Sequence, residues 1–138
     1  QAPGRYDQDF RFGSANPKCA FFLVKFLEDV GYSGPRHFDA HAYRTEDYSG
    51  VEDFARGCMR TYLILKERAA RWNADAEIQS LLHELAARGS GAPSVAKYSA
   101  EHGRALLRLE FDRAKLTAQG LAYERLDQLT IEVLLGVR

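Results

Sequence analysis

The sequence predicts a mainly α-helical chain with one short β-strand. Apolar residues recur at helical spacing along most of the 138 residues. Four of the candidate helices begin at residues that cap free backbone N–H groups, and two of the helices end at glycine. One stretch of seven residues alternates polar and apolar side chains, which is typical of a strand. Together these observations predict six helices and one strand.

The first helix is predicted over residues 18–30. Asn16 caps its free N–H groups, Pro17 suits the first helical position, and Gly31 ends it in a left-handed conformation. Three phenylalanines, at positions 21, 22 and 26, widen its apolar stripe beyond one face. We therefore expect this helix to be covered on two sides.

The strand is predicted over residues 34–40. His37, Asp39 and His41 would share one face, and Phe38 and Ala40 would share the other. A single strand leaves its own backbone hydrogen-bonding groups without partners, so it must pair with an unrecognised strand or with another chain. Together with the first helix, this predicts a homo-oligomer, a dimer or a tetramer.

Five further helices complete the pattern. Ser49 and Glu52 have the spacing of a capping box, and a long helix is predicted from there to about residue 73. Its expected buried stripe is Val51, Phe54, Ala55, Cys58, Tyr62, Leu65, Ala69 and Trp72. A helix over about 75–87 would turn Ile78, Leu81, Leu82 and Leu85 inward. Others follow over about 99–109, capped by Ser99, over 112–120, capped by Asp112 and closed by Gly120, and over 123–135.

Composition narrows the classes of function. Lysine and arginine number 19, as do aspartate and glutamate, so no net field attracts nucleic acid or an anionic membrane. Cys19 and Cys58 lie among apolar helical residues, as reduced cysteines of a cytoplasmic protein do. We see no apolar run long enough to span a bilayer and no secretory leader. The expectation is a cytoplasmic protein with no nucleic-acid or membrane partner.

Several blocks of sequence resemble xylose isomerase of the actinobacterial type, in the order of that family. They are Gly4–Gly13, Gly31–Asp39 continuing into Arg44–Asp47, Gly57–Arg68, Tyr123–Leu129 and Leu134–Gly136. The resemblance implies the C-terminal third of a protein with a (β/α)₈ TIM barrel and a helical arm: the last barrel strand, its flanking helices and the arm. Residues 1–74 would be the partial barrel and residues 75–138 the C-terminal arm. A barrel fragment of this kind would be completed by oligomerisation.

The resemblance also implies metal ligands. Xylose isomerases bind two divalent ions, usually Mg²⁺, Mn²⁺ or Co²⁺, which prefer oxygen ligands. Asp7 and Asp9 match ligands of the second ion, and Asp39 matches a ligand of the first. From the residues alone, Asp7 and Asp9 are either an acidic pair that shares a cation from an extended loop or a solvated pair beside Arg5 and Arg11.

The chain departs from the family directly after Asp39. The family usually continues Phe-Lys-Pro-Pro, whereas residues 40–43 read Ala-His-Ala-Tyr, so a lysine near the metals becomes His41. His37 and His41 are therefore either additional metal ligands beside Asp39 or polar residues at a strand end.

By the resemblance, the other metal ligands, the ring-opening histidine and the lysine that polarises the carbonyl precede this chain. Three functions remain open. In the first, the chain is an isomerase-derived protein that keeps part of the metal site and does not turn over sugar alone. Alternatively, it is an active D-xylose/D-xylulose isomerase completed by an N-terminal barrel partner chain, or a non-catalytic assembly module.

Overall fold

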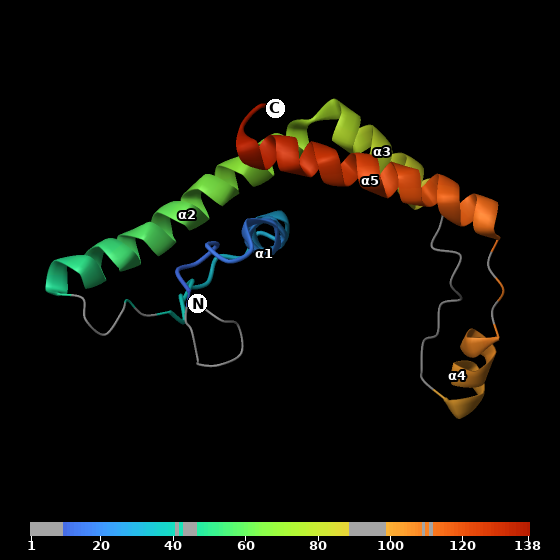
Figure 1. Ribbon diagram of the computed structural model, residues 1–138, viewed down its shortest axis with the longest axis horizontal. Coiled ribbons are helices and arrows are strands. Elements are labelled where there is room, and N and C mark those ends of the chain that lie inside the picture. The colour runs from blue at the N-terminus through green and yellow to red at the C-terminus, as the bar shows by residue number, and fades with distance from the viewer. Residues whose placement is uncertain (1–9, 41, 43–46, 89–98, 109, 111) are drawn as a thin grey trace. The chain divides into compact units, whose positions relative to one another are not determined.

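The computed structural model describes residues 10–40, 42, 47–88, 99–108, 110 and 112–138. These residues form a mainly helical structure (Figure 1). Its helices are α1 (Pro17–Asp29), α2 (Tyr48–Ala74), α3 (Ala76–Arg88), α4 (Ala100–Leu107) and α5 (Arg113–Leu135). Across the described ranges, no helix has the length and apolar character needed to cross a membrane.

The chain divides into two compact units. One comprises Gln1–Ala74 together with Ile131–Arg138, and the other comprises Asp75–Thr130. The last turn of α5 therefore belongs to the first unit, whereas the rest of that helix belongs to the second.

Helix α1 begins and ends as predicted. The side chain of Asn16 accepts a hydrogen bond of 2.9 Å from the backbone N–H of Cys19, and Pro17 takes the first turn. At the other end, Gly31 has a φ of +64°. Its N–H donates to the carbonyl of Glu28, and the N–H of Tyr32 donates to that of Leu27, which satisfies two terminal carbonyls.

The core of the first unit lies where α1 packs on α2. Phe21 and Val24 of α1 are fully buried, but Phe22 is 42% exposed and Phe26 is 62% exposed. The three phenylalanines therefore do not share one core, and the described residues do not supply the cover on a second side that the sequence led us to expect. On α2 the predicted stripe is buried from Cys58 onward, at positions 58, 62, 65, 69 and 72.

The predicted stripe of α2 is wrong in its first two turns. Val51 is 49% exposed, Ala55 is exposed and Phe54 is only half-buried. A helix of 13 residues is about 20 Å long, and one of 27 residues is about 40 Å long. Helix α1 is therefore too short to cover all of α2.

The start of α2 also differs from the prediction. Asp47, rather than Ser49, is the capping residue, because its side chain accepts a hydrogen bond of 2.8 Å from the N–H of Gly50. Ser49 lies inside the helix, and Glu52 forms an ion pair of 2.6 Å with Arg56 instead of reaching back. The capping-box interpretation was wrong because an acidic cap two residues earlier starts the helix sooner.

Two predicted helices near the C-terminus are one continuous helix, α5. Asp112 caps it as predicted and accepts a hydrogen bond of 2.9 Å from the N–H of Ala114. Gly120 does not end it, because the helix continues through this residue, whose φ is not positive. Glycine inside an exposed helix costs only about 1 kcal/mol relative to alanine. The true end is Gly136, with a φ of +79°.

The second unit places α3 beside α5 (Figure 1). Ile78 of α3 and Leu129 of α5 are fully buried, and Leu85 and Ala122 are nearly so. An ion pair of 2.6 Å between Glu77 and Arg125 connects the two helices at the surface. Helix α4 begins as predicted, with Ser99 accepting a hydrogen bond of 3.1 Å from the N–H of His102.

The predicted strand is not formed: residues 34–40 are neither helix nor strand, and the described residues contain no strand at all. Within the described part of the chain, no hydrogen bond engages the backbone of residues 37–40. A strand is defined by its pairing, and the part of the chain that is described offers no partner strand.

Candidate functional site

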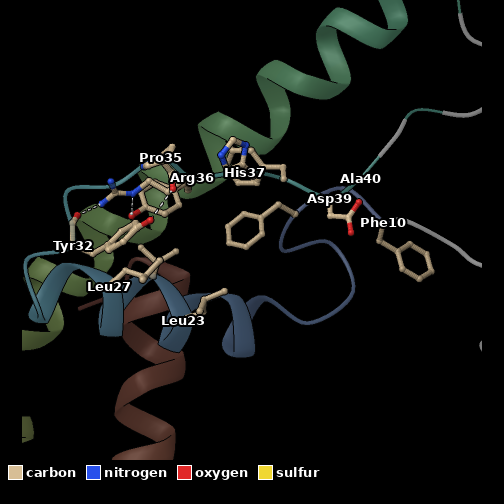
Figure 2. Close-up of a pocket in the computed structure, with 13 residues that line it drawn as sticks. Phe10, Leu23, Leu27, Tyr32, Pro35, Arg36, His37, Asp39 and Ala40 are labelled. Carbon is tan, nitrogen blue, oxygen red and sulfur yellow. Dashed lines mark hydrogen bonds between the residues drawn. The ribbon is translucent and has the colours of Figure 1, made fainter.

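The segment of residues 32–40 runs past α1 and α2 and carries two of the predicted site residues, His37 and Asp39 (Figure 2). Hydrogen bonds from Arg36 fix the beginning of this segment. The guanidinium of Arg36 donates to the carbonyls of Tyr32 at 2.7 Å and Gly34 at 2.8 Å, which closes the turn after α1. It also donates to the hydroxyl of Tyr62 on α2 at 2.9 Å and to the carboxylate of Glu28 on α1 at 3.3 Å.

Glu28 is the centre of this network. One carboxylate oxygen accepts hydrogen bonds from the hydroxyl of Tyr62, at 2.6 Å, and from Arg36. The other lies 2.8 Å from the ammonium of Lys66. Hydrogen bonds from Lys66 and Tyr62, with the positive charges of Lys66 and Arg36, hold the pKa of Glu28 below its ordinary value of 4.5. Glu28 is therefore a carboxylate at neutral pH.

This pKa predicts how stability depends on pH. Because the folded-state pKa of Glu28 is lowered, its contribution to stability is fully present above about pH 4.5 and is lost as the pH falls through the folded-state value. We expect the free energy of unfolding to fall in acid less steeply for Glu28→Gln than for the wild type. The two slopes of this free energy against pH should differ by the equivalent of up to about one bound proton. Urea titrations at a series of pH values between 7 and 3 measure this slope.

Asp29 adds a second contribution in the same range and provides a comparison. Burial acts to raise its pKa, but hydrogen bonds from Lys25 and Asn73 outweigh that effect, and the net shift is downward. Asp29→Asn should therefore also flatten the acid limb, and the double variant should flatten it further. Identical slopes for the wild type and Glu28→Gln would contradict the assignment of Glu28.

Aromatic contacts hold the middle of the segment. The ring of Phe38 lies 5.3 Å from that of Phe12 and 6.5 Å from that of Tyr62, measured between centroids. The N–H of Phe12 donates to the thiol of Cys58 at 3.4 Å. Phe38 is half-buried, whereas His37 and Asp39 are exposed. The predicted alternation along residues 37–40 is therefore present, although the strand is not.

A pocket of about 380 Å³ lies between this segment and the two helices (Figure 2). The side chains of Leu23 and Leu27 on α1 point toward the pocket, and Tyr62 on α2 also lines it. His37 and Asp39 lie along its segment side. The pocket is thus apolar at its base, with a carboxylate and an imidazole at its edge.

Only some of the predicted metal ligands lie among the described residues. Asp39 and His37 both line the pocket. Asp7, Asp9 and His41 lie outside the described residues. Among the residues that are described, no group of three or more His, Cys, Asp or Glu side chains could hold a metal ion. The described part therefore brings one predicted carboxylate ligand to the pocket and no complete site.

Sequence reasoning missed the network of Arg36, Tyr62, Glu28 and Lys66. Its members come from three elements and are separated by up to 38 positions, so no local spacing connects them. A signal was present nonetheless. Arg36 lies in one of the blocks that resemble xylose isomerase, and Tyr62 and Lys66 lie in another.

Comparison with known proteins supports the family resemblance. No protein-family model matches the chain. Xylose isomerases of Thermus caldophilus and Thermus thermophilus are each 55% identical to it over 139 aligned residues, which cover 100% of this chain and 36% of each relative. Xylose isomerase of Streptomyces lividans is 46% identical over 140 residues, covering 97% of this chain and 34% of the relative.

The chain thus spans about a third of the length of the curated relatives that it matches. The similarity extends over its whole length and includes the segment with Arg36 and Asp39 as well as both helices that hold it. The resemblance seen in the sequence is confirmed, and the chain is a relative of xylose isomerase that corresponds to the C-terminal part of that protein.

Proposed function

We propose that this chain is the C-terminal part of a xylose-isomerase-like aldose–ketose isomerase and does not turn over sugar by itself. The observation that carries the proposal is 55% identity along the entire chain to about a third of two xylose isomerases. In this proposal the segment around Phe38 is the last strand of a (β/α)₈ barrel, α1 and α2 flank it, and residues from Asp75 onward form the arm.

The free backbone of residues 37–40 supports the barrel proposal. The side chains of these residues alternate between exposed and half-buried, as in a strand, yet in the described structure the residues make no backbone hydrogen bonds. Buried backbone groups are nearly always paired in native proteins. Neighbouring strands from the rest of a barrel would supply those partners and convert the segment into a strand.

The proposed metal site follows from the positions of the carboxylates. Asp39 is exposed at the pocket edge, and Asp7 and Asp9 would be the further oxygen ligands of Mg²⁺, Mn²⁺ or Co²⁺. His37 and His41 are additional candidate ligands or polar partners. In xylose isomerases the divalent ions hold and polarise the oxygens of the sugar. Because the described residues contribute Asp39 without a complete ligand set, we propose that the chain supplies part of a site finished by other residues.

A chimera tests the proposed function. The matching third of Thermus thermophilus xylose isomerase is replaced by these 138 residues within one polypeptide. We expect this chimera to convert D-xylose to D-xylulose in the presence of Mg²⁺ or Mn²⁺, since its upstream part supplies the acid–base residues. The 138-residue chain alone should show no conversion above background.

Two outcomes would contradict the proposal. Metal-dependent conversion by the chain alone would show that it is a complete enzyme. A chimera that folds, as judged by circular dichroism, and yet has no activity would show that this sequence does not perform the isomerase role.

The outer face of α1 favours an assembly role alongside this function. It consists of Phe22, Phe26 and Val30, which are between 42% and 62% exposed. A continuous apolar face of this kind usually marks an interface. We propose that it is covered by a second copy of this chain, in a dimer or tetramer, or by an N-terminal barrel partner chain.

The oligomeric state can be measured directly. In size-exclusion chromatography with light scattering, we expect two or four times the protomer mass of 15.6 kDa at micromolar concentration. Phe26→Ser should weaken the association at least tenfold, because burial of a phenylalanine contributes about 1.5 to 3 kcal/mol. Leu107→Ser on α4, where Leu107 is 88% exposed, is the control and should leave the mass unchanged. A folded wild-type monomer would refute a second copy as the occupant of this face and would leave the N-terminal barrel partner chain.

A further inference from the structure

We propose that Tyr62 and Glu28 are positioning residues that act, through Arg36, on the segment that carries His37 and Asp39. We call the three side chains Arg36, Tyr62 and Glu28 the Arg36 latch. The significance of the latch for catalysis rests on the proposed function, but its effect on the segment does not.

The first argument is that, among the described residues, Arg36 makes the hydrogen bonds that tie residues 33–40 to the helices. Within the described residues, no hydrogen bond engages residues 37–40, whereas Arg36 donates four. Two of these close the turn through the carbonyls of Tyr32 and Gly34. The other two reach Tyr62 on α2 and Glu28 on α1, so one guanidinium connects the turn to both helices.

The second argument is that the contact is directional. A planar guanidinium donates along fixed directions, and hydrogen bonds to charged groups are shorter and stronger than neutral ones. Phe38, farther along the segment, contacts Phe12 and Tyr62 through its ring. Ring contacts are less strictly directional than hydrogen bonds to a guanidinium, so they hold the segment near the helices but fix its direction less closely.

The third argument is that every acceptor of the latch is occupied. The hydroxyl of Tyr62 accepts from Arg36 and donates to Glu28, whose second oxygen pairs with Lys66. Tyr62 is only 9% exposed and Arg36 and Glu28 are half-buried, so the bonds of the Tyr62 hydroxyl are partly shielded from water. The absence of a side chain at Gly34 leaves room for the Tyr32 hydroxyl, which a β-carbon there would overlap. That hydroxyl donates to the carbonyl of Pro35 within the same turn.

Limited proteolysis tests the latch on the full 138-residue chain. Trypsin cleaves after Arg36 only when the bond between residues 36 and 37 can enter the protease. We expect Tyr62→Phe, which removes one hydroxyl and keeps the ring, to speed cleavage at this bond about tenfold. Tyr48→Phe is the matched control, because Tyr48 lies on the same helix, is 85% exposed and should leave the rate unchanged.

Cleavage after Arg71, on α2, distinguishes positioning from a general loss of stability. A positioning role predicts an unchanged rate there, whereas global loosening of the fold would raise both rates together. Equal acceleration at both bonds, or no acceleration after Arg36, would overturn the proposal.

A double-mutant cycle in the chimera then tests whether the latch serves Asp39. Tyr62→Phe should lower turnover about tenfold when Asp39 is present and have little further effect in the Asp39→Asn background. The same factor in both backgrounds would show that the latch does not act through Asp39. An inactive chimera would count against the proposed function, and the cleavage rates would still decide the latch.

Discussion

Asp39→Asn in the xylose isomerase chimera is expected to lower turnover by a factor of about 100 to 1,000. Asp39 is exposed at the edge of the pocket, where the resemblance implies a carboxylate ligand of a divalent ion. The amide of asparagine has nearly the same shape but no charge, so it balances less of the charge on the ion. Loss of one electrostatic group in an active site typically costs a factor of this size. Steady-state conversion of D-xylose measures it.

Mn²⁺ binding provides a second readout of the same substitution. Calorimetric titration should show weaker binding by the Asp39→Asn chimera than by the unsubstituted chimera. Asp53→Asn is the matched control, since Asp53 is exposed on α2 outside the pocket and should change neither measurement. Turnover above one tenth of the unsubstituted value in Asp39→Asn would rule out a ligand role for this carboxylate.

Leu65→Ala is expected to destabilise the chain by about 2 to 5 kcal/mol, the range for leucine truncation in a core. Leu65 is 6% exposed, in the middle of the buried stripe that α2 turns toward α1. Its loss removes apolar contacts and leaves a cavity that the neighbouring helix fills only in part. Chemical denaturation followed by the fluorescence of Trp72, the single tryptophan and 4% exposed, measures the change.

Leu63→Ala is the matched control for this experiment. Leu63 lies two positions away on the same helix and is 62% exposed. Its truncation should change the free energy of unfolding by no more than about 0.5 kcal/mol. If both variants lose the same stability, the outer face of α2 is buried in an assembly. If neither loses stability, the stripe through Leu65 is not the core.

Local features of this fold could be predicted from the sequence because their causes are local. Asn16, Ser99 and Asp112 each cap a helix through a hydrogen bond to a residue two or three positions ahead. Gly31 ends α1 because glycine, which lacks a β-carbon, adopts the left-handed conformation without strain. Prediction was wrong where two local signals competed. Asp47 started α2 before Ser49 could, and Gly120 marked a helix end that the helix passes through.

The sequence by itself thus determined the helices, most of their caps and the family resemblance. Only the tertiary structure decided which side chains of α1 and α2 are buried and which groups hold the segment with Asp39. Residues 37–40 alternate as a strand does, but pairing needs hydrogen bonds to a distant part of a chain, and the described residues offer none. Likewise, Tyr62 meets Arg36 across 26 positions and Glu28 across 34. The packing of α1 on α2 brings these groups together, and no local spacing encodes it.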